Sequence, residues 1–278
     1  MLSLTEMAVE VLMTADGRAK AALSRQHAHR WQTARAAGEV PPVGMAQPPA
    51  LPARPALPQL LSPREVPRRR PGTAAGRIAL LHAVAHIELN AVDLHWDIIA
   101  RFAPVPMPIG FMDDWVKAAD EESKHFNLMC DCLAAQGSHY GALPAHAGLW
   151  QAATDTAQDL MGRLAVVPMV LEARGLDVTP GMIAVFEAAG DAAAIAALNT
   201  IYAEEVQHVA YGSKWFNFLC GRHDLDPAPT FHAAVRRYFH GSLKPPFNAE
   251  KRAEAGLPPD FYWPLAETDA AGLTGKSD

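Results

Sequence analysis

The sequence predicts an all-α fold built around four long helices. Apolar residues recur at helical spacing in four long stretches, and alanine, the strongest helix former, is abundant. Clusters of proline and glycine separate these stretches, and such clusters end helices. We therefore expect a four-helix bundle over residues 73–220. An N-terminal helical arm and a proline-rich strap (1–72) would precede it, and a C-terminal wrap (221–278) would follow it.

Composition limits the size and the class of the protein. A chain of 278 residues can bury one substantial core with appendages. Its net charge of -6 argues against a general binder of nucleic acids or anionic membranes, because such proteins are basic. The three cysteines, Cys130, Cys132 and Cys220, form no CxxC pair and are interpreted as small core residues. The sequence shows no secretory signal and no membrane-spanning run, so we expect a cytoplasmic protein.

The first 72 residues divide into an arm and a strap. Helical periodicity extends over residues 2–37, with a break near Asp16. Residues 41–71 then hold 10 of the 23 prolines, so this segment should be extended, either as a linker or as a strap over the body. The three arginines at 68–70 are interpreted as a solvated turn rather than a phosphate contact.

Four helical segments follow the strap. In the third of them, Pro168 should kink the helix or open its hydrogen-bond ladder one turn before Glu172. A break is expected at Gly175, with a new helix starting at Thr179 and the proline after it. The four predicted helices span, in order, residues 73–102, 110–136, 149–174 and 191–219.

The last segment, residues 221–278, is expected to wrap over the bundle. It contains one helical stretch around Phe231–His240, followed by aromatic and proline-rich words such as LKPPFN and PPDFYWPL. The final residues are polar and are expected to be disordered.

The apolar stripes of the four helices contain charged residues where a core is expected. Two helices carry a Glu-x-x-His pair at the i, i+3 spacing that lets both side chains reach one ion, and the other two carry a single glutamate. A carboxylate buried alone is strongly destabilising, so a stable fold must pair it, neutralise it or bind it to a metal. These residues are, in chain order, Glu88, Glu122, His125, Glu172, Glu205 and His208.

The spacing of the glutamates indicates one shared site. Glu88 and Glu122 are 34 positions apart, and Glu172 and Glu205 are 33 apart. The midpoint of each pair falls at a predicted turn, and residues equidistant from the turn of an antiparallel hairpin lie at equal height. Each hairpin therefore brings its lone glutamate level with its Glu-x-x-His pair. Four carboxylates carry a charge of about -4, which two divalent cations would neutralise, so the pattern predicts a dinuclear metal site.

The order Glu, Glu-x-x-His, Glu, Glu-x-x-His on four helices resembles the ferritin-like di-iron or di-manganese carboxylate superfamily. The resemblance covers about residues 73–220 and all six positions. It implies two divalent metal ions, iron in preference to manganese, with Glu122 and Glu205 as bridging ligands and Glu88 and Glu172 as terminal ones. The words HAVAHIELNAVDL, DEESKH and LEARGLDVTPGM also resemble an uncharacterised bacterial branch named only as domain of unknown function 455.

One feature departs from the superfamily. Its bundles use a long crossover between the second and third helices. Only about a dozen residues, spanning at most ~40 Å, lie between the predicted helices here.

Tyr202 and two further glutamates lie close to the predicted ligands. Tyr202 is a candidate catalytic residue, which could donate to a ligand carboxylate or take part in redox chemistry; core packing with a hydrogen bond is the alternative. Glu121 and Glu204 fit the apolar stripes less well than their neighbours. They are interpreted as outer partners of the ligands or as surface ion-pair residues.

Three other polar residues share the helix of the first glutamate. His95, on the same stripe, is interpreted as a hydrogen-bonded core histidine rather than a ligand. Asp93 and His86 could orient ligands from outside or lie at the surface.

The resemblance implies an oxidase or monooxygenase that uses O2 to oxidise an unidentified small molecule. Electrons would come from an external donor, because the sequence holds no cofactor domain, and a homodimer is compatible with the sequence. The alternatives are a ferroxidase or iron store, a tRNA hydroxylase-like enzyme, a manganese catalase, or a helical interaction module with a structural metal. The extensions at both ends disfavour a storage cage, and the acidic charge disfavours a nucleic-acid partner.

Overall fold

The computed structural model describes residues 2–62, 65–67, 70–146 and 148–266 as a helical body with two short strands. This confirms the all-α prediction. Two of the three arginines at 68–70 and the predicted polar tail, residues 267–278, lie outside the described residues. Within the described ranges, no helix combines the length and the apolar character that a bilayer crossing requires.

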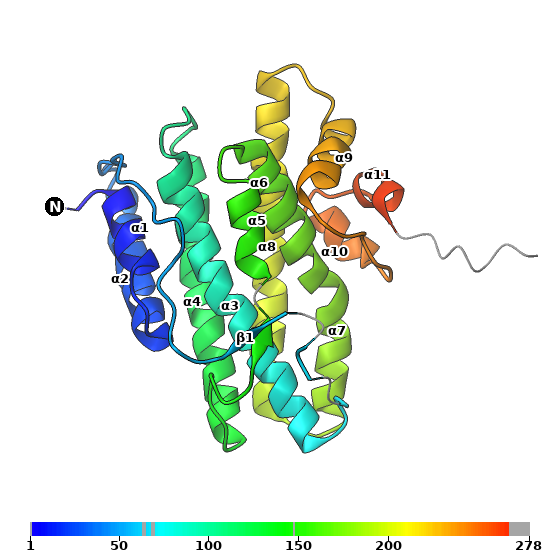
Figure 1. The fold of residues 1–278 in the computed structure, drawn as a ribbon. Coiled ribbons are helices and arrows are strands. Elements are labelled where there is room, and N and C mark those ends of the chain that lie inside the picture. The colour runs from blue at the N-terminus through cyan, green and yellow to red at the C-terminus, as the bar shows by residue number, and fades with distance from the viewer. Residues whose placement is uncertain (1, 63–64, 68–69, 147, 267–278) are drawn as a thin grey trace, which may run out of the picture.

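Four long helical columns form the body (Figure 1). Three of them begin at side-chain caps: Thr73, Asp159 and Asp191 accept hydrogen bonds from the N–H groups of Gly76, Gly162 and Ala194, respectively. The first column packs on the second, the third on the fourth, and the second on the fourth. The columns are α3 (Ala74–Phe102), α4 (Gly110–Ala135), a composite of α6 (Leu160–Val166), η1 (Val167–Glu172) and α7 (Ala173–Glu187), and α8 (Ala192–Arg222).

The middle of the third column is the π-helical turn η1. Pro168 lies in its first turn and has no N–H to donate, so the hydrogen-bond ladder opens there as predicted. Helix α8 passes this turn at Gly212, where a Cβ atom would lie 2.5 Å from Cγ of Pro168. The glycine therefore lets α8 approach the segment that ends at Glu172.

The predicted break at Gly175 and restart at Thr179 are wrong, because α7 continues through both positions with Pro180 inside it. Pro180 removes the N–H that would bond to the carbonyl of Leu176. Asn248, which lies far along the chain, donates its side-chain N–H to that carbonyl at 3.3 Å. This tertiary hydrogen bond supplies the partner that the helix itself cannot, and the helix persists.

The predicted start of the third helix at residue 149 is also wrong. A separate short helix, α5 (Leu149–Asp155), belongs to the connection between α4 and α6, which covers residues 136–159. The strand β2 (Ala145–His146) of this connection pairs in parallel with β1 (Leu60–Leu61). Helix α5 then runs back along the bundle, so that α4 and the third column run in the same direction (Figure 1). The connection is thus longer than the dozen residues expected.

The N-terminal arm packs on the first two columns. It consists of α1 (Leu4–Leu12) and α2 (Gly17–Ala36), and the predicted break at Asp16 is confirmed because its side chain caps α2. Lys20 of α2 forms an ion pair with Asp93 of α3, and both side chains are buried. The arm is therefore fixed to the bundle by charge as well as by apolar packing.

The proline-rich segment is a strap laid over the body rather than a free linker. The carbonyl of Pro42 accepts a hydrogen bond from the Leu4 N–H at 3.0 Å, and the N–H of Ala53 donates to the Leu12 carbonyl at 2.8 Å. Backbone bonds of this kind satisfy an extended chain that has few donors of its own.

The C-terminal segment wraps over the third and fourth columns. Its main anchor is Arg252, whose guanidinium lies 2.6 Å from the carboxylate of Asp177 on α7, with both groups buried. The elements are α9 (Pro227–Tyr238), α10 (Ala249–Glu254), α11 (Pro259–Tyr262) and a 3-10 turn, η2 (Trp263–Leu265).

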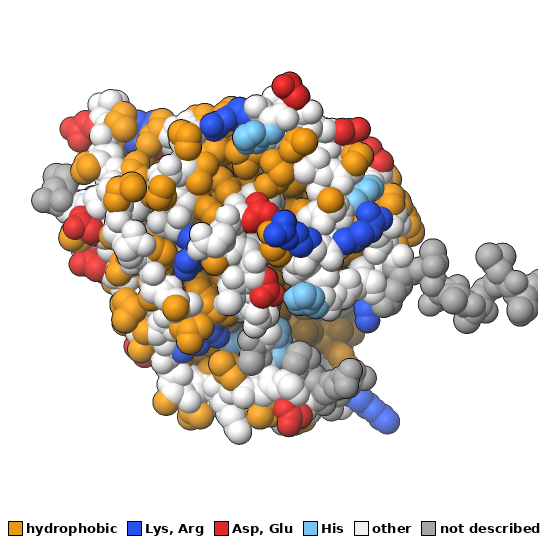
Figure 2. All heavy atoms as spheres, turned by 45° about the horizontal axis from the view of Figure 1, so that its top comes forward, with side chains coloured by type: hydrophobic (Ala, Val, Ile, Leu, Met, Phe, Trp, Pro, Cys, Tyr) orange, Lys and Arg blue, Asp and Glu red, His pale blue; other side chains and the backbone are white. Residues whose placement is uncertain are grey.

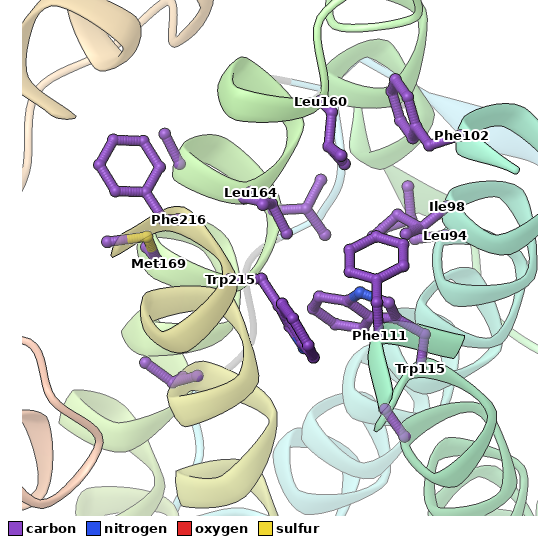
Figure 3. Close-up of a cluster of buried hydrophobic side chains, with 14 of the residues drawn as sticks. Leu94, Ile98, Phe102, Phe111, Trp115, Leu160, Leu164, Met169, Trp215 and Phe216 are labelled. Atoms are coloured by element: carbon purple, nitrogen blue, oxygen red, sulfur yellow. The ribbon is translucent and has the colours of Figure 1, made fainter. Parts of the chain in front are cut away.

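One large apolar cluster fills the space between α3, α4, α6 and α8 (Figure 3). In it, the ring of Phe111 packs edge-on against Trp115 and Trp215, with centroid separations of 6.1 and 5.5 Å. Aromatic packing of this kind holds the columns in a fixed relation to one another.

Replacing Gly212 by alanine should lower the free energy of unfolding by about 1–3 kcal/mol, because the new methyl group would overlap Pro168. The matched control is Gly221→Ala on the same helix, where no atom lies within 4 Å of the added Cβ. That change should leave stability equal or raise it by up to about 1 kcal/mol. Urea unfolding of both variants measures the difference, and equal stabilities would contradict the close approach of α8 to η1.

Candidate metal centre

The six predicted residues converge in the middle of the bundle and form one cluster of carboxylates and imidazoles, called the cluster from here on. Each of the four columns contributes at least one of them, and Glu172 is placed by the end of the π turn. Five are buried, and the side chain of Glu172 is only slightly exposed. The contributions are Glu88 from α3, Glu122 and His125 from α4, Glu172 from η1, and Glu205 and His208 from α8.

Four of these residues form a first group around His125. Its Nδ1 lies 3.3 Å from a carboxylate oxygen of Glu88, 3.6 Å from one of Glu122 and 3.7 Å from one of Glu205. One donor atom from each residue lies within 4.8 Å of all the others. The group therefore offers three carboxylates and one imidazole to a single cation.

His208 and Glu172 belong to a second group, with His95 as the third member, whose donor atoms also lie within 4.8 Å of one another. Glu122 stands between the two groups. Its Oε1 is 3.0 Å from Nδ1 of His208, whereas its Oε2 is 3.6 Å from Nδ1 of His125. One carboxylate thus presents an oxygen to each group, which is the geometry of a bridge.

Most of these separations suit shared coordination better than hydrogen bonding. Distances of 3.3–3.7 Å, such as those from His125 to its three carboxylates, are long for a direct bond. Two donor atoms that each lie about 2.1 Å from one ion are roughly 3.0–3.4 Å apart at right-angle or tetrahedral geometry. The 3.3 Å separation falls in this range, and those of 3.6 and 3.7 Å lie slightly above it. The residues therefore fit two divalent ions.

Two outer carboxylates orient the imidazoles. Glu204 lies 2.7 Å from Nε2 of His125, and Glu121 lies 3.0 Å from Nε2 of His208. A carboxylate accepts the N–H at Nε2, so in the neutral imidazole Nδ1 carries the lone pair, and it faces the carboxylates of the cluster. The pairs are crossed between helices, because each outer glutamate contacts the histidine of the opposite column. Both residues thus take the outer position that the sequence predicts.

The electrostatics of the cluster reflect its burial. Burial and the neighbouring charge of Glu122 raise the pKa of Glu88 well above its usual range. Burial also raises the pKa of Glu172, and the charge of Glu205 adds to this effect. Burial opposes the ionised form of Glu122 as well, but the three imidazoles that face it, those of His125, His208 and His95, hold its pKa well below the usual range. Protons thus offset much of the charge, and cations would have to displace them.

Burial disfavours the charged form of His125 and of His208, the histidines of the two Glu-x-x-His pairs. The surrounding carboxylates nevertheless raise the pKa of His125 and of His208 well above the usual value. Since metal ligation needs the neutral imidazole, cation affinity should increase with pH.

Tyr202 forms no hydrogen bond with the predicted ligands in the described part of the chain. Its hydroxyl accepts a hydrogen bond of 2.6 Å from the side chain of Asn248 in the C-terminal segment, and its ring packs against the apolar core. The structure thus shows the packing alternative rather than a contact with a ligand carboxylate. We assign this residue no chemical role.

His86 and Asp93 are both buried and turned away from the ligands. Nδ1 of His86 contacts the Tyr140 hydroxyl at 2.8 Å, and its Nε2 contacts the carbonyl of His146 at 3.1 Å. Asp93 forms the ion pair with Lys20. Both residues therefore connect α3 to the arm and the crossover instead of orienting a ligand.

A cavity of about 340 Å³ adjoins the carboxylates. All four glutamates line it, whereas His95, His125 and His208 do not, so the imidazoles lie behind the carboxylates as seen from the cavity. The volume is that of a small-molecule site. Its apolar lining includes Val84, Ala91 and Leu94 of α3, Val178 of α7, and Leu198 and Ile201 of α8.

The chain belongs to the family described as "Protein of unknown function (DUF455)", which it matches over residues 13–263. This confirms the family that the sequence words predicted. An uncharacterized protein of Haemophilus influenzae is 39% identical over 208 residues, which are 73% of this chain and 72% of that protein. No solved structure matches the chain.

The burial of His86 predicts a pH-dependent stability. Burial lowers its pKa from 6.5 to about 4, so the unfolded chain takes up a proton that the folded protein does not. This difference in pKa contributes up to about 3 kcal/mol to the free energy of unfolding. The contribution is fully present above pH 6.5 and is lost as the pH falls towards 4. Unfolding of wild type and His86→Gln at a series of pH values isolates this contribution.

The difference between the two unfolding free energies should shrink across this pH range. The control is Gln26→Ala, at an exposed position of α2 that carries no titratable group, whose difference from wild type should stay constant. A constant difference for His86→Gln would contradict the burial of a neutral imidazole.

Proposed function

We propose that this chain is a ferritin-like dimetal carboxylate protein that oxidises a small apolar molecule with O2. The observation that carries the proposal is the convergence of four carboxylates and two oriented imidazoles in one buried core. Protons or cations must balance this charge, and two divalent ions balance it completely. The donor separations of 3.0–3.7 Å support sharing of ions among these groups.

The topology supports the superfamily. The ligand order Glu, Glu-x-x-His, Glu, Glu-x-x-His falls on successive columns of the bundle. The connection over residues 136–159 returns along the bundle before the third column begins, as the long crossover of ferritin-like proteins does. The shortage of crossover residues expected from the sequence therefore gives no reason against this assignment.

The donor set favours iron. Mixed carboxylate and imidazole ligation suits iron, with manganese as the alternative. Two ferrous ions bound side by side would supply electrons for the reduction of O2. The remaining electrons would come from an external donor.

The residues around the ions would perform three tasks. Glu121 and Glu204 hold the imidazoles in one tautomer and orientation. The apolar walls of the cavity would exclude water and bind a substrate with little polarity. The position of the carboxylates between cavity and imidazoles would direct exchangeable coordination positions towards that substrate.

The surface supports a small-molecule substrate over a nucleic acid. On the face drawn in Figure 2, basic and acidic side chains are scattered among apolar ones, and the described residues there form no continuous basic patch. The net charge of -6 agrees with this. A cytoplasmic location is part of the proposal.

Metal content tests the centre directly. Apoprotein titrated anaerobically with Fe(II) should bind two ions per chain and should then consume O2, with a rise in near-ultraviolet absorption from oxidised iron. Glu122→Ala removes the carboxylate shared by both groups and should leave one ion or none. The control Glu187→Ala, at an exposed position of α7, should bind both.

Two outcomes would contradict the proposal in different ways. Less than one ion per chain, with no effect of Glu122→Ala on metal content or stability, would exclude the dimetal centre. Full loading without O2 consumption would instead favour a helical module with a structural metal.

A side chain that fills the cavity should prevent the binding of a small apolar molecule and leave the binding of the two ions unchanged. Ala91→Phe would place a ring in the space beside the carboxylates. Fluorine NMR of fluoroindole, used as a small apolar probe, should show binding to wild type and none to this variant, while both bind two ions. Ala184→Phe on the exposed side of α7 is the control. Equal binding by Ala91→Phe and wild type would place the substrate elsewhere.

A further inference from the structure

His95 of α3 is a buried group that the six-residue pattern leaves unexplained. Its side chain is fully inaccessible to solvent, and neither ring nitrogen has a hydrogen-bond partner among the described residues. A neutral imidazole carries one N–H donor and one lone pair, and a buried polar group without a partner costs about 1–3 kcal/mol. The interpretation of His95 as a hydrogen-bonded core histidine therefore fails.

The ring points at the carboxylates of the cluster. Nε2 lies 3.5 Å from Oε1 of Glu122 and 3.6 Å from Oε1 of Glu172. These separations are too long for good hydrogen bonds, but they lie close to the spacing of two ligands on one ion. His208 completes the same group, with donor atoms of His95, Glu172 and His208 within 4.8 Å.

Aromatic packing holds the imidazole in this orientation. The indole of Trp115, also fully buried, stacks on it with centroids 5.3 Å apart and planes inclined by 26°. The ring of His208 meets it edge-on at 5.7 Å. A side chain fixed on one face by an indole is preorganised, which reduces the entropy lost when its nitrogen binds a cation.

The second hairpin has no histidine at the position that corresponds to His95 in the first. Glu88 is followed by His95 seven residues later, and the equivalent Glu172 is followed seven residues later by Thr179. Thr179 is buried and lines the cavity, whereas His95 does not. The two hairpins therefore offer different donors, and the extra imidazole belongs to the group that contains His208.

We propose that His95 is a seventh metal ligand, which gives the second ion two imidazoles and makes the two ions chemically inequivalent. This rests on the proposed dimetal function. The first ion would have the donors Glu88, Glu122, Glu205 and His125, dominated by carboxylates. The second would have Glu172, His208 and His95 with the shared Glu122, so it should prefer cations that favour nitrogen ligands.

The test is a cobalt(II) titration of the full-length apoprotein, followed by calorimetry and by visible absorption. Wild type should bind two ions with distinct affinities and spectra. His95→Ala should keep the first ion and bind the second about 10- to 100-fold more weakly, with a changed spectrum for that ion alone. His95→Asp, which restores a donor atom, should recover part of the affinity. His27→Ala, a buried histidine of α2, is the control and should bind as wild type does.

The outcomes separate this inference from the proposed function. If wild type binds no cobalt, the dimetal function fails. If wild type binds two ions and His95→Ala binds both with unchanged affinity and spectrum, the dimetal centre stands and the role of His95 is refuted. Circular dichroism of the metal-free variants verifies folding, and His95→Gln, which keeps most of the side-chain volume, replaces the alanine variant if that one is unfolded.

Discussion

The burial of four carboxylates in one helical core is the constraint on which the rest of the structure depends. In the described part of the chain, no lysine or arginine forms an ion pair with Glu88, Glu122, Glu172 or Glu205. Balance must come from imidazoles, protons or cations. The π turn at Pro168, the close passage of α8 at Gly212 and the crossed outer glutamates all place donor atoms around one point. The extensions at both ends then cover the bundle with further buried ion pairs.

Features that depend on local chemistry could be predicted from the sequence. Asp16 and Thr73 mark helix starts because a short polar side chain caps the following N–H groups. Pro168 opens its ladder because it has no donor. The convergence of the six residues followed from matched distances to the turns, which is a property of hairpins and not of any one side chain. All six came together as expected.

Features that depend on distant partners could not be predicted. Helix α7 continues through Pro180 because the side chain of Asn248 donates a hydrogen bond to the carbonyl of Leu176. The same side chain also donates to the Tyr202 hydroxyl. The start of the third column was hidden because α5 has helical periodicity but belongs to the crossover. His95 looked like any polar residue on an apolar stripe. Only its two unpartnered nitrogens and its distances to Glu122 and Glu172 distinguish it.

The most direct test of the dimetal centre is anomalous diffraction at the iron edge from crystals grown after anaerobic iron loading. Two peaks should appear inside the bundle. One should lie among the donor atoms of Glu88, Glu122, Glu205 and His125, and the other among those of Glu122, Glu172 and His208. Iron peaks only at the surface, with the four buried carboxylates bonded to protons or water, would contradict the account.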